Sequence, residues 1–389
     1  MMNEKNISQI GKKCVGCGNC KNVCPKQAVR LVTSDEGFLI PEIIFSKCIQ
    51  CEKCLSYCPV ENKVKSENIG AYGLTEEDKP ELMKSASGGA AYMASKLFID
   101  NGGYVCGCVF DENLHAVHIV SNNLEDIRRM RMSKYVQSDI SDCFPRIKEL
   151  LKQNKKVLFI GTPCQVHALS LYAEKYRENL TLIDIICHGC PSPGLFSAYI
   201  RSLEKKEKGK IANFKFRYKL PDKWGKYYIY YEVPEKNRKR IKEFYFENYG
   251  YAFFEGLSFR ESCYICSYTS VFSRPGDITL GDFWHVDEYY PQVKHKNGVS
   301  AVLVNTEKGN ELFQRIREGN DVFSCDKEEI IKWQENLNHP VKRPEKRDIY
   351  YKNFSEDFYI AKKGPSKMKS RLVRCIPPSL KEKLKNILR

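Results

Sequence analysis

The sequence predicts a protein of mixed α+β and α/β class, in which a small cysteine-rich module of bacterial-ferredoxin type precedes a larger α/β body. Two observations predict this class. One cysteine motif occurs twice within residues 1–66, and strand-like apolar segments alternate with helix-like segments over residues 87–330. Such alternation is typical of a sheet flanked by helices. The polar stretch 67–86 is expected to be a connector, and residues 331–389 are expected to form a peripheral basic tail.

The repeated motif has the spacing C-x2-C-x2-C-x3-C-P, in "KKCVGCGNCKNVCPKQA" and again in "SKCIQCEKCLSYCPV". This spacing is typical of ferredoxins with two 4Fe–4S clusters, where the fourth cysteine of each run ligates the other cluster. One predicted ligand set is Cys14, Cys17, Cys20 and Cys58, and the other is Cys48, Cys51, Cys54 and Cys24. Zinc sites and disulfides are the alternatives, but zinc usually takes two C-x2-C pairs.

Within the body, a helix is expected from near Ser87 to the glycine pair Gly102–Gly103. An aromatic-rich hairpin is expected from 214–219 and 226–233. The other expected strands are 104–110, 115–120, 155–161, 180–186, 277–284 and 300–306, and further helices are expected to begin at 162 and 195.

Cysteines also follow two of the expected body strands. Cys164 and Cys187 come directly after 155–161 and 180–186, and parallel strands would place both thiols at one edge of the sheet. With the pair Cys263 and Cys266, they could ligate a third cluster; Cys190 is a rival for the place of Cys187. The alternatives are small buried hydrophobic residues and a zinc half-site. The remaining cysteines are interpreted as structural: Cys106, Cys108, Cys143, Cys325 and Cys375.

Signals for other ligands are weaker. The chain has no G-x-G-x-x-G or Walker motif. "SGG" at 87–89 and "GTP" at 161–163 lie at expected helix starts, where free backbone N–H groups bind phosphate or simply receive a cap. His188 is either functional or a structural histidine, and Asp282 either binds a ligand or caps a turn. No catalytic acid or base is assigned.

The composition indicates an unexported protein. "MMNEKNISQI" has no apolar signal core, and no apolar run approaches the ~18 residues of a membrane helix. A cytoplasmic location is therefore expected, where eighteen cysteines serve metals or redox chemistry rather than disulfides. The net charge of +15 lies mainly in residues 362–389, with ten Lys or Arg and one Glu. No nucleic-acid motif accompanies it, so no nucleic-acid partner is expected.

Seven strings in this order resemble the coenzyme F-420 hydrogenase/dehydrogenase beta-subunit family, preceded by a ferredoxin module. The strings are "SASGG", "SKYVQSDI", "GTPCQ", "CHGCPSP", "SCYIC", "GDITLGDFW" and "NGVSAVLVNT", and the resemblance covers roughly residues 10–320. It implies a flavin-binding α/β domain with FAD and a 4Fe–4S cluster beside it. The implied ligands of this third cluster are Cys164, Cys187, Cys263 and Cys266. The implied flavin-site residues are Ser87, Gly88, Gly89, Lys134, Tyr135, Gln137, Ser138, Gly161, Thr162 and Pro163.

The function implied by the resemblance is electron transfer between 4Fe–4S clusters and FAD, with hydride transfer to or from a deazaflavin or another organic acceptor. The expected partners are that acceptor and a redox protein, such as a ferredoxin or a hydrogenase or dehydrogenase subunit. The alternatives are an electron-transfer subunit without flavin and a redox-associated partner protein in surface-polysaccharide biosynthesis. The segment "SLKEKLKNILR" is expected to form a basic amphipathic helix. This helix would make peripheral contact with the inner membrane face, dock to a partner, or simply be solvated.

Overall fold

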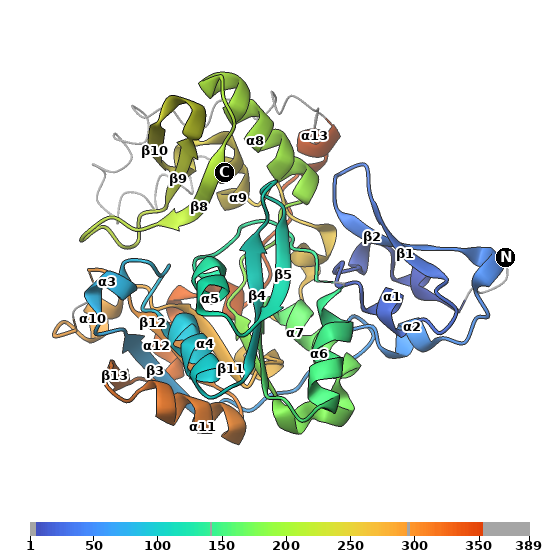
Figure 1. The fold of residues 1–389 in the computed structure, drawn as a ribbon, viewed down its shortest axis with the longest axis horizontal. Coiled ribbons are helices and arrows are strands. Elements are labelled where there is room, and N and C mark those ends of the chain that lie inside the picture. Colours follow the sequence, from blue (N-terminus) through green and yellow to red (C-terminus); the bar gives the residue numbers. More distant parts are fainter. Residues whose placement is uncertain (1–4, 141, 294–295, 353–389) are drawn as a thin grey trace.

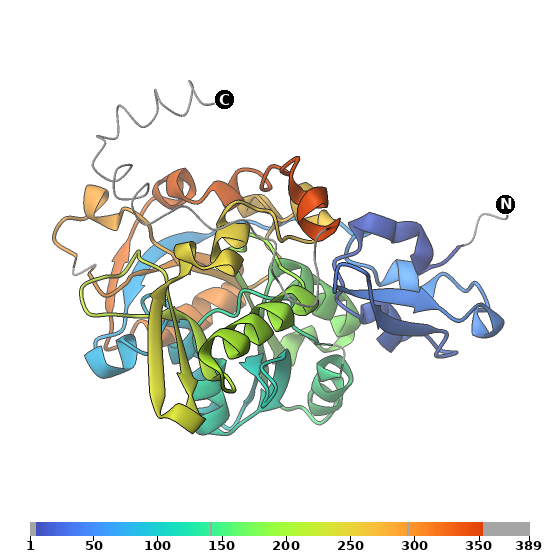
Figure 2. The same cartoon turned by 90° about the horizontal axis from the view of Figure 1, so that it is seen from above.

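A computed structural model describes residues 5–140, 142–293 and 296–352 (Figures 1 and 2). In both views the N-terminal module lies to one side of a larger body. Among the described residues, no helix is long and apolar enough to cross a membrane.

The module is a β-hairpin with short helices around its cysteines. Strands β1 (Val29–Thr33) and β2 (Leu39–Ile43) pair antiparallel. The helical elements are η1 (Ile7–Lys13), α1 (Asn19–Val23), η2 (Phe45–Lys47) and α2 (Lys53–Ser56). Gly18 (φ 70°) precedes α1 and Glu52 (φ 58°) precedes α2, so both cysteine loops turn through the left-handed region at equivalent places.

The body is built on an eight-stranded sheet in the order β13-β3-β12-β11-β7-β6-β4-β5. The neighbours β11, β7, β6 and β4 are parallel, and the outer pairings are antiparallel. This mixed sheet confirms the expected α/β body. The strands are β3 (Gly70–Thr75), β4 (Tyr104–Phe110), β5 (Ala116–Ser121), β6 (Val157–Gly161), β7 (Leu180–Ile185), β11 (Ile278–Asp282), β12 (Ser300–Val304) and β13 (Asp321–Ser324).

Helices cover both faces of this sheet because its central strands are apolar on both sides. On β6, Leu158 packs with α4 (Ala90–Asp100), α5 (Leu124–Met130) and α11 (Glu307–Ile316) in one cluster. Its neighbour Phe159 packs with α6 (Cys143–Lys152) and α7 (Pro163–Tyr172) in another. The expected helix near Ser87 is confirmed as α4.

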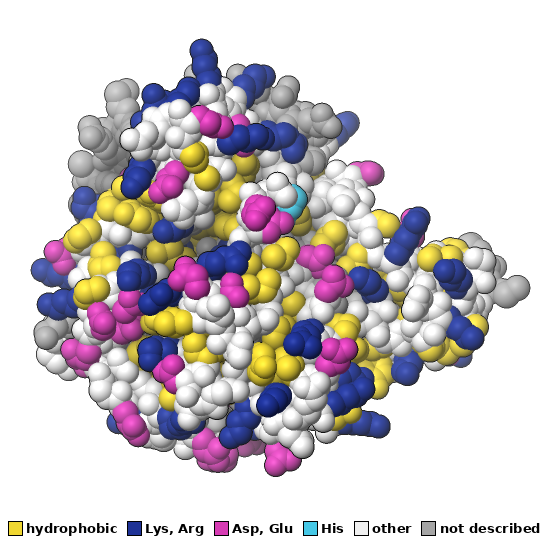
Figure 3. All heavy atoms as spheres, in the orientation of Figure 1, with side chains coloured by type: hydrophobic (Ala, Val, Ile, Leu, Met, Phe, Trp, Pro, Cys, Tyr) yellow, Lys and Arg dark blue, Asp and Glu magenta, His cyan; other side chains and the backbone are white. Residues whose placement is uncertain are grey.

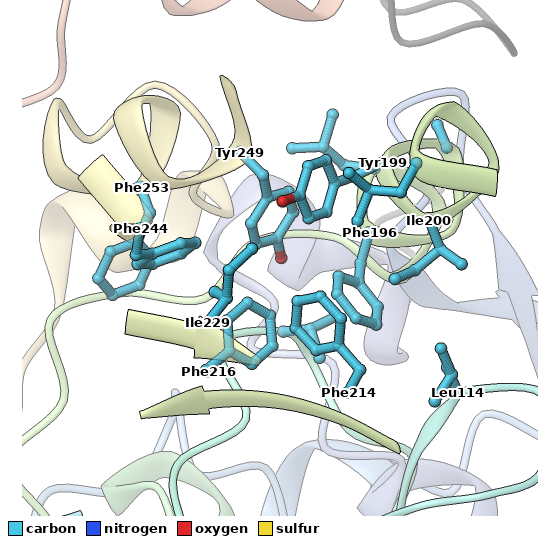
Figure 4. Packing of buried hydrophobic residues seen from close by; sticks show 14 of the residues in the cluster. Leu114, Phe196, Tyr199, Ile200, Phe214, Phe216, Ile229, Phe244, Tyr249 and Phe253 are labelled. Atoms are coloured by element: carbon cyan, nitrogen blue, oxygen red, sulfur yellow. The ribbon is translucent and has the colours of Figure 1, made fainter. Parts of the chain in front are cut away.

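The predicted aromatic hairpin forms as β8 (Ala212–Tyr218) and β9 (Tyr228–Val233), and β10 (Arg238–Glu243) extends it to three strands. It packs against α8 (Pro193–Glu207) and α9 (Asn248–Phe254). Figure 4 shows the aromatic core between them, in which the Phe196 and Phe214 ring centroids lie 5.4 Å apart.

Two expectations about the ends of the body were wrong. The expected connector 67–86 contains β3, which lies inside the sheet between β12 and β13. Its glycines, Gly70 and Gly73, lie under the rings of Tyr72 and Phe323, and they obscured the strand pattern in the sequence. The short helix α3 (Lys79–Leu82) completes this part of the chain, and another short helix, α10 (Val286–Tyr289), lies between β11 and β12 in the sequence.

The expected peripheral tail also begins within the body, because 331–352 is packed rather than peripheral. Helices α12 (Lys327–Trp333) and α13 (Arg347–Lys352) lie there. The Arg347 side chain is fully buried and donates to both carboxylate oxygens of Glu36 in the module, at 2.8 and 2.6 Å. The rest of the expected tail, with its amphipathic helix and Cys375, lies outside the described residues.

Candidate functional site

Four module cysteines lie close to the body, and we call them the inner thiol group: Cys14, Cys17, Cys20 and Cys58. Burial raises the pKa of Cys17, and the nearby thiols of Cys20, Cys14 and Cys58 raise it further. Burial also raises the pKa of Cys20, and the thiols of Cys14, Cys58 and the neighbouring Cys54 raise it further. These four therefore lie together as one predicted ligand set. Cys17 also packs in the body's cluster under β6.

The other four module cysteines form the outer thiol group, of which Cys54 is buried and the other three are partly or fully exposed: Cys24, Cys48, Cys51 and Cys54. All four line one hollow between the two cysteine loops. Cys51 is exposed, and it is the one exposed cysteine in the described part of the chain. The crossed grouping predicted from the spacing therefore agrees with the placement of the thiols, and their role as cluster ligands stays a prediction.

A third group of thiols forms at the edge of the large sheet. Strands β6 and β7 are parallel neighbours, so Cys164 and Cys187, just beyond their carboxyl ends, lie at the same edge as predicted. Helix α7 begins there with a capping box, in which Thr162 N donates to Gln165 Oε1 at 3.0 Å. Cys263 and Cys266 arrive on the turn η6 (Glu261–Ile265) and the residue after it.

Cys190 joins these four, so the body thiol group has five members: Cys164, Cys187, Cys190, Cys263 and Cys266. Burial, and then the thiols of Cys263, Cys187 and Cys164, raise the pKa of Cys190. All five line one cleft of about 320 Å³, which we call the β6–β7 cleft. Its volume is within the range of small-molecule sites. Because a cubane takes four thiolates, one of the five is spare.

No three or more His, Cys, Asp or Glu side chains of the described residues are grouped so as to hold a single metal ion. A cubane makes a different demand on the protein. Each of its four irons takes one thiolate, so the four sulfurs surround the cluster rather than converge on one point. Burial disfavours the charged form of a thiol and so raises its pKa, whereas coordination to a metal favours the thiolate.

Tyr268 links the inner and body thiol groups. Its hydroxyl donates to the carbonyl oxygen of Pro59, next to Cys58, at 3.3 Å, and lies 2.9 Å from His167 Nδ1. Burial raises its pKa, and the thiols of Cys164 and Cys266 from the body and Cys17 and Cys58 from the module raise it further. One buried side chain therefore lies within electrostatic reach of both groups.

Arg260 is a second link that sequence reasoning missed. Its guanidinium donates to the carbonyl oxygens of Cys14, at 3.1 Å, and Leu39. Arg260 also donates to Gln137 Oε1 at 3.3 Å. Its place three residues before Cys263 is the one signal that could have drawn attention to it. Tyr268 lies two residues after Cys266, so its place in the sequence could have drawn attention to it in the same way.

The implied flavin-site residues divide between two places. Gln137, Ser138, Thr162 and Pro163 line the β6–β7 cleft. Gln165 Nε2 donates to Ser138 Oγ at 2.9 Å, which holds the cleft wall together. Gly161 ends β6 just behind Thr162.

The remaining implied residues lie outside the lining of this cleft, and several have structural work. Lys134 Nζ donates to four carbonyl oxygens at the end of α5, the shortest at 2.8 Å to Arg131. Gly88 leaves no room for a side chain, because a Cβ there would lie 2.0 Å from Leu74 O. Gly89 (φ 96°) begins α4, and the Ser87 hydroxyl donates to Val299 O at 2.7 Å.

Tyr135 and Asp282 belong to a buried network around Arg217. Arg217 donates to both Asp282 carboxylate oxygens, at 2.9 and 3.3 Å, and to the Tyr135 hydroxyl at 3.1 Å. It also donates to Ala86 O at 3.2 Å, beside Ser87. The carboxylate of Asp282 is therefore paired with Arg217, which neither of the two roles considered for it included.

The other singled-out residues are buried in the body. His188 lines the β6–β7 cleft, with Nδ1 3.0 Å from Asn336 Nδ2, and burial lowers its pKa. The cysteines interpreted as structural pack in or against apolar clusters where the structure describes them: Cys106, Cys108, Cys143 and Cys325.

Comparisons with known proteins agree with the two-part arrangement. Residues 13–62 match the model of the 4Fe-4S dicluster domain. Residues 154–329 match the model of the C terminus of the coenzyme F420 hydrogenase/dehydrogenase beta subunit. The second segment includes all five thiols of the body group.

One relative is a subunit of the F(420)H(2) dehydrogenase of Methanosarcina mazei. It is 24% identical over 323 residues, which cover 80% of this chain and 84% of the relative. A chain of the F420-reducing [NiFe] hydrogenase complex from Methanosarcina barkeri is similar in structure, with a TM-score of 0.47 and 18% identity. The match covers 72% of this chain and 97% of that chain.

The predicted family resemblance is thereby confirmed. The chain is similar to the iron–sulfur oxidoreductases of the coenzyme F420 hydrogenase/dehydrogenase beta-subunit family. It joins a 4Fe–4S dicluster segment to a beta-subunit segment in one polypeptide.

Proposed function

We propose that the chain is an FAD-dependent oxidoreductase with three 4Fe–4S clusters, which exchanges a hydride with a deazaflavin or another organic acceptor. The observation that carries the proposal is the β6–β7 cleft, which brings five thiols to one sheet edge beside the module. The cleft includes Val15 and Pro59 of the module, so it opens directly toward the inner thiol group.

The three thiol groups follow one another from the surface inward. The outer group has an exposed cysteine, the inner group packs under the body, and Tyr268 joins the inner group to the body group. Each 4Fe–4S cluster carries one electron, and a bound flavin supplies the exchange between single electrons and a two-electron hydride. Two electrons and one proton then make up the hydride.

The chain's own residues fit a flavin beside the body group. Gln137, Ser138 and Thr162 supply amide and hydroxyl groups along the cleft wall, and Arg260 supplies a buried cation. The cleft volume of about 320 Å³ suits a ring system held by a few polar contacts. These residues would bind and orient the cofactor and exclude water from the cluster beside it.

The relatives support partner subunits. The Methanosarcina mazei protein is, by its name, a subunit of a dehydrogenase. We propose that this chain also exchanges electrons with another redox protein. The domain limits proposed are 1–66 for the cluster module and 87–330 for the flavin domain, with β3 added to the latter.

The test is the iron, sulfide and flavin content of protein purified without oxygen. We expect about twelve irons and one FAD per chain. About eight irons without flavin would overturn the flavin site and leave an electron-transfer subunit. The variant Thr162→Ala/Gln165→Ala is expected to lower flavin retention, whereas Ser202→Ala, on the far end of α8, is the control and should leave it unchanged.

A further inference from the structure

The surface around the outer thiol group combines apolar and cationic side chains. Phe45 and Ile49 are 62% and 57% exposed, and they lie on either side of Cys48 in the chain. Exposed Cys51 follows shortly after. Large apolar side chains that stay exposed beside a candidate redox centre indicate a surface that another molecule covers.

Three lysines accompany these side chains: two line the hollow of the outer thiol group with Ile49 and Cys51, and the third lies between Phe45 and Cys48 in the chain. Lys26, Lys47 and Lys53 are exposed, and none has a carboxylate partner among the described residues. Nearby, Lys5 pairs with Glu52 at 3.1 Å. The face of the module in Figure 3 likewise shows lysine or arginine and hydrophobic side chains at its outer end.

The positive charge continues onto the body. Burial lowers the pKa of Lys148 on α6, and the charges of Lys152, Lys53 and Lys175 lower it further. The module's Glu36, in contrast, is turned inward to Arg347. The outer end of the module is therefore cationic, and this charge would attract an acidic protein over a distance.

We propose that this docking face, defined as Lys26, Phe45, Lys47, Ile49, Cys51 and Lys53, receives a small acidic electron-carrier protein. This proposal rests on the proposed function, in which the outer thiol group holds a 4Fe–4S cluster. In each encounter one electron passes between the carrier's centre and this cluster; one is oxidised, the other is reduced, and no bond forms or breaks.

The size and chemistry of the face favour a transient carrier over a permanent subunit. Permanent interfaces are large and apolar, whereas electron-transfer encounters are small and weak. Only two large apolar side chains lie here among the lysines, so charge would supply most of the attraction. The short distance from the surface to Cys51 then allows electron exchange without a long-lived complex.

The experiment measures reduction of the as-purified protein by a reduced, acidic clostridial-type 2[4Fe–4S] ferredoxin, followed without oxygen as bleaching of the cluster absorbance. The variant Lys47→Glu/Lys53→Glu should lower the second-order rate constant about 10-fold or more at low salt, with a smaller loss at high salt. The control, Lys208→Glu/Lys239→Glu, makes the same charge change at exposed sites around the three-stranded sheet.

Dithionite, a small reductant, should reduce parent and variant at equal rates, because it needs no docking face. A second variant, Phe45→Ala/Ile49→Ala, keeps the lysines and should lower the ferredoxin rate at every salt concentration. If the charge-reversal variant loses iron, this second variant tests the docking face in its place.

Unchanged ferredoxin rates in both variants, with full iron content, would overturn the docking face and leave the proposed function intact. Absence of iron in the parent would overturn the proposed function itself. If ferredoxin rates stay the same while charge reversal abolishes sedimentation with phosphatidylglycerol vesicles, the face is a membrane surface and the carrier proposal is wrong.

Discussion

The module and the body assemble their thiols in opposite ways. In the module, three thiols of each group come from one cysteine run, and the fourth thiol comes from the other run. In the body, the five thiols come from three separate loops at the edge of one sheet. The module's sites are therefore fixed by local spacing, whereas the body's site exists only after the sheet has formed.

The two regions also differ in what stabilises them. The module's core has few apolar side chains besides cysteines: Ile7, Ile10 and Val29 pack with Cys20, Cys54 and Cys58. The body has four apolar clusters of its own, including the aromatic core of Figure 4. A small core that consists partly of predicted metal ligands is expected to depend on its metal to stay folded.

Iron removal should produce the largest difference between the regions. We expect the amide protons of the module to lose their protection against hydrogen exchange after chelation under reducing conditions, because its core includes the ligands. Amides of β6 and β7 should stay protected. Simultaneous loss of protection in both regions would contradict this, and would show that module and body fold as one unit.

Substitution of the body thiols comes next in size. Cys164→Ser should remove about four irons per chain, whereas Cys190→Ser should leave the iron content of the parent, because four of five thiols suffice for a cubane. Iron analysis and electron paramagnetic resonance of the reduced protein would measure both. A third variant, Cys187→Ser, distinguishes the two rivals. If Cys190→Ser loses iron while Cys187→Ser keeps the iron content of the parent, Cys190 is the ligand in place of Cys187.

A smaller effect is expected at the link between the regions. Tyr268→Phe removes a hydroxyl that bonds Pro59 O and faces His167, so it should slow electron exchange between module and body a few-fold. The unpaired groups left behind should also cost about 1–3 kcal/mol of stability.

The clusters are reduced in a stopped-flow experiment, and the measured quantity is the ratio of the rate constants of the slow and fast phases. Tyr264→Phe is the matched control, because that buried hydroxyl donates to Gly256 O within the body. Equal kinetics in both variants would show that Tyr268 is only a packing residue.

The last prediction concerns the body alone and leaves the iron–sulfur chemistry unchanged. Burial raises the pKa of Glu76 from 4.5 to about 7, and its partner Arg131 lies 3.8 Å away. Folding therefore favours the protonated form, so the parent should lose stability relative to Glu76→Gln as pH rises from 4.5 to 7. The loss is on the order of 3 kcal/mol at most, and the difference stays constant at higher pH.

Denaturant unfolding of parent and Glu76→Gln across this pH range, monitored by tryptophan fluorescence, measures the difference. Glu77→Gln is the control, since that side chain is exposed. Parallel stability curves for parent and Glu76→Gln would contradict the buried position of the carboxyl.

Local chemistry explains what could be predicted. The spacing of the module's cysteines predicted the two crossed thiol groups, and apolar runs predicted β4, β6 and β7 with the helices between them. The prediction that Cys164 and Cys187 lie close together depended on taking β6 and β7 as parallel strands, which they are. Gly70–Thr75 escaped prediction because its glycines interrupt the apolar pattern, and the Phe323 ring that lies over Gly73 comes from the distant strand β13.

The sequence by itself determined which cysteines group in the module, because the repeated spacing keeps three thiols of each run together and places the fourth with the other run. Only the tertiary structure decided that Cys190 joins the body group, that Tyr268 lies between inner and body groups, and that Lys134 is used to end a helix. These are contacts between residues far apart in the chain, and they depend on how the sheet edge, η6 and the module pack together. Local spacing carries no information about that packing.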